Sequence, residues 1–325
     1  MSKSIALCTL AAAFSAVAFA PVPGHAQAWP GKPVRIIVPF GPGGGTDIQA
    51  RVLSAAFHDA TGQSFIVENR TGASGLIGAE VAANSPPDGY TILFSTATVT
   101  INKTLYGSRM KVDPVKDLAS ISWLTSTPLV LVVHPSVPAK SVKQLVALAK
   151  RKPGFLNSGI NVPGSTSHLA AEMLKQAADI EAVIVPYKGG GPAITALMSG
   201  EIDYLFCTGP VAAANLKSGR IRALAVTTPK KASAFPDLPT MNTFYPGFES
   251  DNWYAMWFPA GTPRDIVTKM NALIVKALQT EKVRQFMATE GLDPVASSPE
   301  ELAAQVRKEI AKYANVIHMA DIKLQ

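Results

Sequence analysis

Cysteine is scarce in this sequence, and its scarcity limits how the fold can be stabilised. One of the two cysteines, Cys8, lies in an apolar run near the N-terminus, which leaves Cys207 alone in the rest of the chain. A single cysteine cannot form an internal disulfide. If the N-terminal segment is removed, the fold must therefore be stable without disulfide bonds, even in an oxidising compartment.

The motifs of common enzymes are also missing. No serine lies in a G-x-S-x-G turn, there is no H-E-x-x-H pair, and the histidines after residue 28 are isolated in the sequence: His58, His134, His168 and His318. These absences argue against nucleophilic catalysis and against a metal site. We therefore expect a protein that is not an enzyme, with no catalytic residue, no metal and no cofactor.

Two further absences narrow the class of protein. No cluster of basic residues interleaved with aromatics is present, so we expect no nucleic-acid partner. After residue 28 every apolar run is broken within about ten residues by proline, glycine or a charge, and about 20 are needed to cross a bilayer. The formal net charge of +7 is scattered along the chain and argues only weakly for anionic ligands.

The N-terminus has the order of a secretory signal. Lys3 precedes an apolar run over residues 5–20, and a proline-containing stretch then ends in Ala26-Gln27-Ala28. A charged start, an apolar core and small residues at the junction are typical of a cleaved signal peptide. We expect residues 1–28 to be this signal and the mature protein to be periplasmic. Cys8 lies too early to be a lipoprotein cysteine.

The rest of the chain alternates short apolar runs with helical patterns. We expect strands over 34–39, 65–68 and 91–95, a helix over 47–60, and an α/β fold whose parallel sheet is covered by helices on both faces. Capping oxygens at Ser141, Thr262 and Ser298 predict helix starts, because each precedes a periodic apolar run and has Gln, Glu or Pro nearby.

Two apolar strands predict that the chain forms two lobes and passes from one lobe to the other twice. Residues 127–135 (TPLVLVVHP) and 253–259 (WYAMWFP) each follow one group of elements and precede another. Two crossings imply a discontinuous first lobe of residues 29–128 and 253–325 and a second lobe of residues 129–252. A composition that is 47% hydrophobic can supply two such cores. A cleft between two lobes is a common place for a ligand.

A glycine-rich turn joins the first predicted strand to the first helix. Residues 38–48 read VPFGPGGGTDI, and the loop ends in Gly45-Thr46 rather than in Gly-Lys-Ser/Thr or in the last glycine of a dinucleotide fingerprint. Free N–H groups and the dipole at a helix start favour an anion. We therefore expect a carboxylate site, with a tight turn that binds nothing as the alternative.

Two more turns repeat this pattern. Asn157-Ser158-Gly159 continues through Gly164-Ser165-Thr166-Ser167-His168 into a helix, and Lys188-Gly189-Gly190-Gly191-Pro192 follows an apolar strand and opens another. A serine-rich loop that only caps its helix is the plain alternative for the first of them. Together the three helix starts predict one anion site.

The motifs, in their order along the whole mature chain, resemble those of the Bug family of periplasmic receptors. They are WPGKPVRIIVPFGPGGGTD, PPDGYTILF, the Gly/Ser/His helix start, VPYKGGGPAITALMSGEID and WYAMWFPAGTP. The resemblance implies a two-lobed, type II periplasmic-binding-protein fold that closes on a carboxylate ligand. It also implies a tripartite tricarboxylate transporter, with a two-subunit membrane permease as the docking partner.

Matching positions to the family pattern predicts the ligand-binding residues. They are Phe40, Gly43, Gly44, Thr46 and Asp47 in the first loop, Ser95 and Thr96 after the third strand, Asn157, Gly159, Ser165, Ser167 and His168 in the middle of the chain, and Cys207. The family often has an acidic residue where this chain has Cys207. A neutral residue there disfavours ligands with an amino group.

The sequence thus predicts a monomeric solute-binding protein for a small mono- or dicarboxylate, aromatic acids included, that works by lobe closure. Two alternatives stay open. One is a ligand receptor for a sensor kinase, in place of the permease or in addition to it. The other is an exported α/β hydrolase using Ser165 and His168.

Overall fold

The computed structural model describes residues 29–232 and 234–319, so the predicted signal peptide lies outside the described residues. Within them, strands and helices alternate and one mixed sheet runs through the molecule, in the order β2-β1-β3-β9-β4-β7-β5-β6. Strands β8 and β10 pair with β4 beside this path. The sheet has two parts, which lie on either side of β4.

The first part of the sheet is built from the N-terminal third of the chain. Its parallel strands form because continuous apolar runs can be buried on both faces. The elements are β1 (Val34–Val38), α1 (Gly45–Thr61), β2 (Phe65–Asn69), α2 (Leu76–Ala83), β3 (Thr91–Thr96) and α3 (Thr98–Tyr106), with short 3₁₀ turns at Ala73–Gly75 and Gly107–Arg109. The predicted strands over 34–39, 65–68 and 91–95 and the helix over 47–60 agree with these bounds within two residues.

The second part of the sheet comes from the middle of the chain. Strands β5, β6 and β7 are parallel to one another, and β8 pairs antiparallel with β4. The elements are α4 (Val142–Arg151), β5 (Asn157–Ile160), α5 (Thr166–Ala178), β6 (Val183–Pro186), α6 (Gly190–Ser199), β7 (Tyr204–Thr208), α7 (Gly209–Leu216), β8 (Arg222–Val226) and a 3₁₀ turn at Met241–Thr243.

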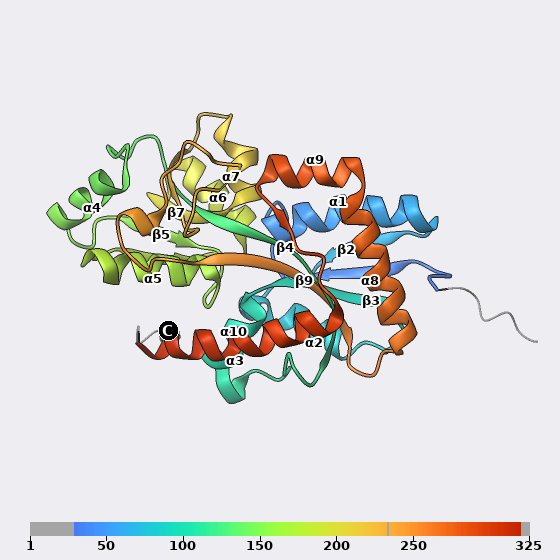
Figure 1. Ribbon diagram of the computed structural model, residues 1–325. Helices are drawn as coiled ribbons and strands as arrows, with labels where there is room; N and C mark the ends of the chain where they lie inside the picture. The colour runs from blue at the N-terminus through green and yellow to red at the C-terminus, as the bar shows by residue number, and fades with distance from the viewer. Residues whose placement is uncertain (1–28, 233, 320–325) are drawn as a thin grey trace, which may run out of the picture.

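Two long strands, β4 (Leu118–Val133) and β9 (Asp251–Pro259), join the two parts and lie side by side in Figure 1. Both run antiparallel to their neighbours, so the sheet is mixed where the sequence suggested a parallel one. Strand β4 pairs with β9 as far as Pro128 and with β7 from Leu129. The lobe boundaries at residues 128/129 and 252/253 stay a prediction, and we note that the first falls where β4 changes partner.

The C-terminal elements return to the first part of the sheet. They are α8 (Arg264–Gln279), α9 (Glu281–Glu290), β10 (Asp293–Pro294) and α10 (Pro299–Met319). In Figure 1, α10 passes below the sheet beside α3, while α9 lies close to α1 on the other side. The last described helix therefore packs against the part of the sheet that is built from residues 34–106.

Two of the three predicted helix caps are confirmed. Ser141 accepts a hydrogen bond from the N–H of Gln144 at 3.3 Å, and Ser298 accepts one from the N–H of Glu301 at 3.2 Å. Thr262 does not cap α8. Its hydroxyl donates to the carbonyl of Pro259, and the helix begins after Pro263, whose fixed φ suits the residue that precedes a helix.

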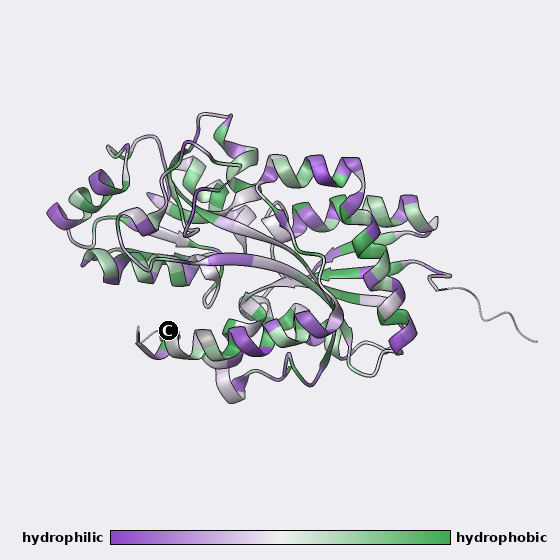
Figure 2. Cartoon of the chain, viewed as in Figure 1, coloured by the Kyte–Doolittle hydropathy of each residue, from purple (hydrophilic) through white to green (hydrophobic). Residues whose placement is uncertain are grey.

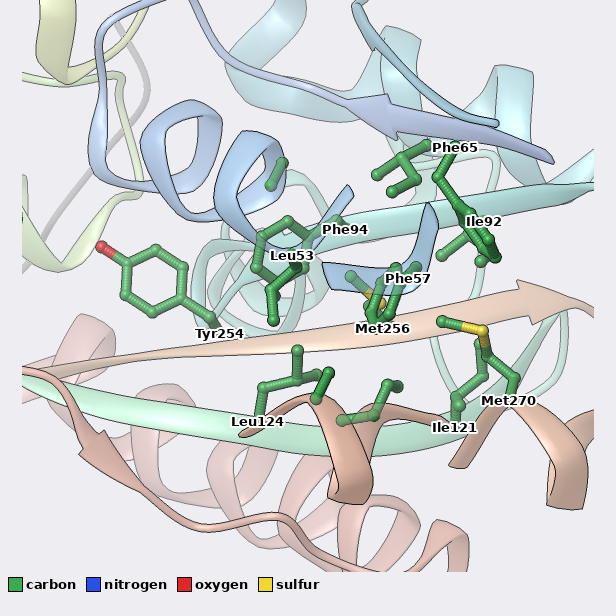
Figure 3. Packing of buried hydrophobic residues seen from close by; sticks show 14 of the residues in the cluster. Leu53, Phe57, Phe65, Ile92, Phe94, Ile121, Leu124, Tyr254, Met256 and Met270 are labelled. Carbon is green, nitrogen blue, oxygen red and sulfur yellow. The ribbon is translucent and has the colours of Figure 1, made fainter. Parts of the chain in front are cut away.

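Apolar side chains fill both faces of both parts of the sheet. Figure 2 shows hydrophobic colour along β1 and β3, hydrophilic or pale colour along much of β9, and hydrophilic colour on parts of α1, α4 and α9. In the first part, Leu53 and Phe57 of α1 pack with Phe94 and Met256, as Figure 3 shows. Separate clusters lie around Tyr204 and Phe206 and around Leu205 and Cys207 in the second part. Each part thus has its own core.

In the part of the chain that the structure describes, no helix combines the length and the apolar character that a membrane crossing requires.

Candidate functional site

A narrow cavity lies where the two parts of the sheet face each other. The volume that water molecules can enter is about 30 Å³. The residues around it come from the starts of helices, from the loops before them and from the three strands β3, β7 and β9: Phe40, Gly44, Gly45, Thr46, Thr96, Thr98, Asn161, Val162, Ser165, Thr166, Gly189, Gly190, Thr208, Asn252 and Tyr254. Segments distant in sequence therefore meet at one site.

The first wall of the cavity is the start of α1. The glycines of the preceding loop allow close approach, and Gly43 has φ +74°, a conformation that glycine adopts without strain. Gly44 precedes the helix and provides no side-chain cap, so the first N–H groups of α1 have no partner from such a cap. The wall therefore presents hydrogen-bond donors beside the hydroxyl of Thr46.

Asp47 holds this loop in place. Its carboxylate accepts hydrogen bonds from the N–H of Gly43 at 3.0 Å, from Nδ2 of Asn69 at 3.1 Å and from Nη2 of Arg51 at 2.9 Å. Burial is the largest single influence and raises the pKa of Asp47, but the hydrogen bonds from Arg51, Gly43 and Asn69 together outweigh it and hold that pKa below its usual value. The carboxylate is ionised and fully engaged with the protein.

The second wall is formed by the starts of α5 and α6. Ser165 caps α5 by accepting a hydrogen bond from the N–H of His168 at 3.3 Å. Helix α6 follows Gly189, which has φ +133°, and has no side-chain cap. The N–H of Gly189 donates to the carbonyl of Asn161 at 2.8 Å, which joins the two turns.

The floor of the cavity comes from the strands. Thr208 ends β7 and precedes α7, and its hydroxyl does not cap that helix. Tyr254 and Asn252 lie on β9, and the hydroxyl of Thr166 donates to Oδ1 of Asn252 at 3.3 Å. Thr96 ends β3 and Thr98 begins α3, and their hydroxyl oxygens lie 3.0 Å apart.

The charge pattern of the site is simple. Among the described residues that line the cavity none carries a charged side chain. Helices α1, α6 and α7 begin at the cavity without a side-chain cap, whereas at the start of α3 the N–H of Thr98 donates to the hydroxyl of Thr96 at 3.3 Å. Uncapped N–H groups and aligned helix dipoles favour an anion such as a carboxylate.

The two parts of the fold touch directly beside the cavity. The N–H of Gly41 donates to the carbonyl of Lys188 at 2.8 Å, so the loop before α1 is hydrogen-bonded to the loop before α6. A Cβ atom on Gly191 would lie 1.9 Å from the carbonyl oxygen of Pro42. Only residues without a side chain allow this contact.

The structure brings some of the predicted site residues together and leaves others away from the cavity. Those that line it are Phe40, Gly44, Thr46, Thr96 and Ser165. Gly43 and Asp47 lie just behind the first wall, where they shape the loop. Ser95, Asn157, Gly159, Ser167, His168 and Cys207 do not line the cavity.

Strand geometry explains why two of the predicted residues do not line the cavity. Successive side chains of a strand point to opposite faces, so Thr96 lines the cavity while Ser95 does not. In the same way Cys207 packs into the apolar cluster of the second part of the sheet, and Thr208, the next residue, faces the cavity. The neutral residue at this place in the site is therefore Thr208.

The predicted turn at residues 157–159 is wrong. These residues lie in β5, which pairs with β6 and β7. The N–H and Nδ2 of Asn157 both donate to Asp203, and Gly159 packs against Ile202 and Tyr187. The turn comes after the strand, so the asparagine at the cavity is Asn161.

Ser165 and His168 are not arranged as a nucleophile and a base. The hydroxyl of Ser165 donates to the carbonyl of Val162 at 2.7 Å, and Nδ1 of His168 accepts from the N–H of Gly164 at 3.1 Å. Burial lowers the pKa of His168 below its ordinary value, so the ring is neutral with its proton on Nε2. Both residues stabilise the turn before α5.

Sequence reasoning missed most of the floor and part of both walls. The missed lining residues are Gly45, Thr98, Asn161, Val162, Thr166, Gly189, Gly190, Thr208, Asn252 and Tyr254. The third glycine-rich turn signalled Gly189 and Gly190. Asn252 and Tyr254 gave no local signal, because their position follows from the pairing of β9 with β4 and β3.

Comparison with known proteins gives a consistent result. Residues 49–322 match the model of a family described as the tripartite tricarboxylate transporter family receptor. The protein BugT of Bordetella pertussis is 35% identical over 316 residues, which is 96% of each chain.

Solved structures agree. A Rhodopseudomonas palustris protein solved with adipate has a TM-score of 0.88 and 34% identity, covering 91% of this chain and 99% of its own. MatC from the same organism, solved with malate, has a TM-score of 0.84 and 29% identity, covering 89% and 100%. Periplasmic binding proteins thus share this fold, and the predicted two-lobed α/β architecture is confirmed.

Proposed function

The chain belongs to the tripartite tricarboxylate transporter receptor family, and from this premise we propose that it is a periplasmic receptor that captures a small organic carboxylate. The Bug resemblance of the sequence is confirmed by this membership. The family and the similar structures are solute-binding proteins, and two of the latter hold the dicarboxylates adipate and malate. The ligand class proposed here is a mono- or dicarboxylate.

One observation carries the proposal. The uncapped starts of α1, α6 and α7 meet at a cavity whose described lining residues include no charged side chain. Backbone N–H groups and hydroxyls directed at a carboxylate form charge-assisted hydrogen bonds, which are stronger than neutral ones. A cationic ligand would meet the positive ends of helices and would be disfavoured.

Lobe closure is the proposed mechanism. The walls of the cavity come from both parts of the sheet, and β4 and β9 connect them, so a ligand can complete its contacts only when the two parts approach. A ligand stabilises the closed state by its differential affinity for the two states. The hydrogen bond from the N–H of Gly41 to the carbonyl of Lys188 joins the two parts beside the cavity, which supports this proposal.

A thermal-shift screen tests the ligand class. The chain without residues 1–28 is mixed with aliphatic and aromatic acids, and an acid at a hundred times its dissociation constant should add about 2.7 kcal/mol to the free energy of unfolding. Amines and sugars of similar size serve as negative controls. A flat response to every acid would contradict the proposal.

A substitution in the first wall tests the site. Thr46→Val removes a hydroxyl that lines the cavity and should weaken carboxylate binding by about fivefold to tenfold, since a hydrogen bond contributes about 1 kcal/mol. Thr61→Val, at the other end of α1, is the matched control, because its hydroxyl bonds to the carbonyl of Phe57. Equal carboxylate affinities for the two variants would show that the hydroxyl of Thr46 does not contribute to binding.

Export and delivery complete the proposal. The sequence pattern of residues 1–28 supports cleavage of a signal peptide, and the family description supports docking to a membrane permease. Cells that lack this protein should take up the identified acid more slowly, and the full chain should restore uptake. Normal uptake without it would argue for a signalling role.

A further inference from the structure

The C-terminal end of α9 lies where the two parts of the fold meet. Helix α9 belongs to the first part, and α7 of the second part packs beside it (Figure 1). A Cβ atom on Gly209, the first residue of α7, would lie 2.8 Å from the carbonyl oxygen of Glu290. A Cβ atom on Gly291 would lie 2.9 Å from the ring of Phe235, which belongs to the core of the second part. The end of α9 is therefore a further direct contact between the parts, besides the loops before α1 and α6.

Glu290 lies on the inward face of this helix. Val283 and Met287 of α9 are buried in the core of the first part, and Glu290 occupies the next position along the same face of the helix. Its carboxylate oxygen Oε2 is buried. The inward face thus starts with apolar side chains and ends with a carboxylate where α9 meets α7.

The buried oxygen of Glu290 accepts no hydrogen bond from any residue that the structure describes. An ionised carboxylate that is buried without such bonds costs free energy, whereas the protonated form costs much less. Burial is accordingly the largest influence and raises the pKa of Glu290, and the opposing effect of Lys217, at the end of α7, is smaller. Glu290 therefore takes up a proton more readily in this arrangement than it would in water.

Lys217 is the charged group that acts on Glu290 from the surrounding elements. Helix α7 and strand β4 contain no titratable side chain within their bounds. The charged side chains of α9 and of the end of α8 are exposed: Lys276, Glu281, Lys282 and Arg284. On α1, Asp47 is engaged by Arg51, and the exposed charged or titratable side chains of α1 and of the loop around Phe235 are Arg51, His58, Asp59, Lys230, Lys231 and Asp237. None of these groups affects the pKa of Glu290.

Separation of the two parts would expose Oε2 to water, and the pKa of Glu290 would then fall toward its ordinary value of 4.5. A group whose pKa is higher in one arrangement than in another stabilises the first arrangement as the pH falls through the higher value. The closed arrangement should therefore gain stability relative to the open one as the pH falls from neutral toward the ordinary pKa of a glutamate.

We propose that Glu290 makes lobe closure sensitive to pH, because its carboxyl group binds a proton as the two parts close, so that carboxylate binding strengthens as the medium becomes acidic. This inference rests on the proposed function and on its closure mechanism. Lys217 limits the effect, since its positive charge favours the ionised form of Glu290.

Calorimetric titration at several pH values tests this coupling. The chain without residues 1–28 is titrated with adipate and with benzoate from pH 8 to pH 5.5, and wild type and variants are compared at the same pH, so that protonation of the acid itself cancels. Between these limits the affinity of the wild type should rise by about threefold relative to that of Glu290→Gln. Glutamine is a neutral side chain of nearly the same shape, so this variant should bind more tightly than the wild type at pH 8.

Two further variants serve as controls. Glu281→Gln makes the same change at an exposed position of α9 and should follow the wild type at every pH. Lys217→Gln removes the opposing charge and should enlarge the pH dependence, mainly by weakening binding at pH 8. Urea unfolding shows whether each variant is folded.

X-ray scattering of the chain without added acid gives a second measurement. The radius of gyration of the wild type should be smaller at pH 5.5 than at pH 8, while that of Glu290→Gln should be equally small at both.

The outcomes separate this inference from the proposed function. If the acids bind but wild type and Glu290→Gln show the same pH dependence, the role of Glu290 is overturned while the receptor function stands. If neither adipate nor benzoate binds, the scattering decides, and a radius of gyration of the wild type that does not change with pH overturns the inference. A thermal-shift screen that is flat for every acid contradicts the proposed function, whatever the scattering shows.

Discussion

At the scale of single residues, Asp47 is a charged side chain that supports the proposed anion site without lining the cavity. Its carboxylate is 4% exposed and is occupied by Gly43, Arg51 and Asn69. These bonds hold Gly43 at a positive φ and so set the path of the loop. The negative charge is also largely offset by Arg51, which protects the potential of the helix start.

The lowered pKa of Asp47 predicts a pH dependence of stability. A carboxyl whose pKa is lower in the folded state stabilises the fold above the unfolded value, and this stability is lost as the pH falls through the folded value. At pH 7, Asp47→Asn should lower the free energy of unfolding by about 1–3 kcal/mol. The difference from the wild type should shrink below about pH 4. Urea unfolding at several pH values measures it.

The control for this prediction is Asp59→Asn on the same helix. Asp59 is exposed, so its replacement should leave the free energy of unfolding within about 0.5 kcal/mol of the wild type at every pH. If the difference in free energy of unfolding between Asp47→Asn and the wild type stays constant from pH 7 to pH 3, the charge of Asp47 does not contribute to stability.

At the scale of elements, local signals fixed most of the fold. The apolar run of residues 34–38 and the glycines after it predict a strand, a turn and a helix without help from the rest of the chain. The capping residues Ser141 and Ser298 mark helix starts because their partners are three residues away. The direction of β4 and β9 depends on distant pairing, and no local pattern encodes it.

The site was harder to predict than the fold, because it depends on which face of a strand a residue occupies. A shift of one residue separates Cys207 from Thr208 and Ser95 from Thr96. The strand β5 was mistaken for a turn because Asn157 and Gly159 are common in turns, whereas pairing with β6 and β7 decides their conformation. Contacts between segments distant in sequence therefore determine which residues line the cavity.

The capping box at α10 gives a prediction at this scale. The N–H of Glu301 donates to the hydroxyl of Ser298, and the N–H of Ser298 donates to Oε2 of Glu301 at 2.8 Å. Ser298→Ala should lower the free energy of unfolding by about 1 kcal/mol, measured by urea denaturation.

A double-mutant cycle supplies the control. Because the two bonds are reciprocal, Ser298→Ala combined with Glu301→Ala should lower the free energy of unfolding by less than the sum of the single changes. Strict additivity would mean that the two side chains act independently and that the box contributes little.

At the scale of the whole molecule, the proposed mechanism predicts that the contact between the loops before α1 and α6 limits how far the lobes close. Gly41 and Lys188 are hydrogen-bonded, and Gly191 lies against Pro42 with no room for a side chain. Strands β4 and β9 provide the continuous connection between the two parts.

Gly191→Ala should therefore impair closure without impairing folding. The new Cβ would lie 1.9 Å from the carbonyl oxygen of Pro42, while alanine in a helix is favoured over glycine by about 0.5–1 kcal/mol. Carboxylate affinity should fall at least tenfold, and the radius of gyration with ligand should stay larger than that of the wild type. Titration calorimetry and X-ray scattering measure the two effects.

Thr195→Ala is the control for this prediction. Thr195 lies one turn further along α6, and its hydroxyl bonds to the carbonyl of Gly191 within the same helix. It should close and bind as the wild type does. If Gly191→Ala also binds normally, the loop contact does not limit closure.

The division of the cavity between the two parts of the fold has a chemical consequence. The starts of α1 and α3 belong to one side and those of α5, α6 and α7 to the other, so each side holds only some of the donors. Under the proposed closure mechanism, the protein would act as a chelator whose two arms are joined by β4 and β9. Once one arm held the ligand, the other would bind it at a high effective concentration. Separation of the arms would remove that advantage, and a tightly held molecule would then dissociate readily.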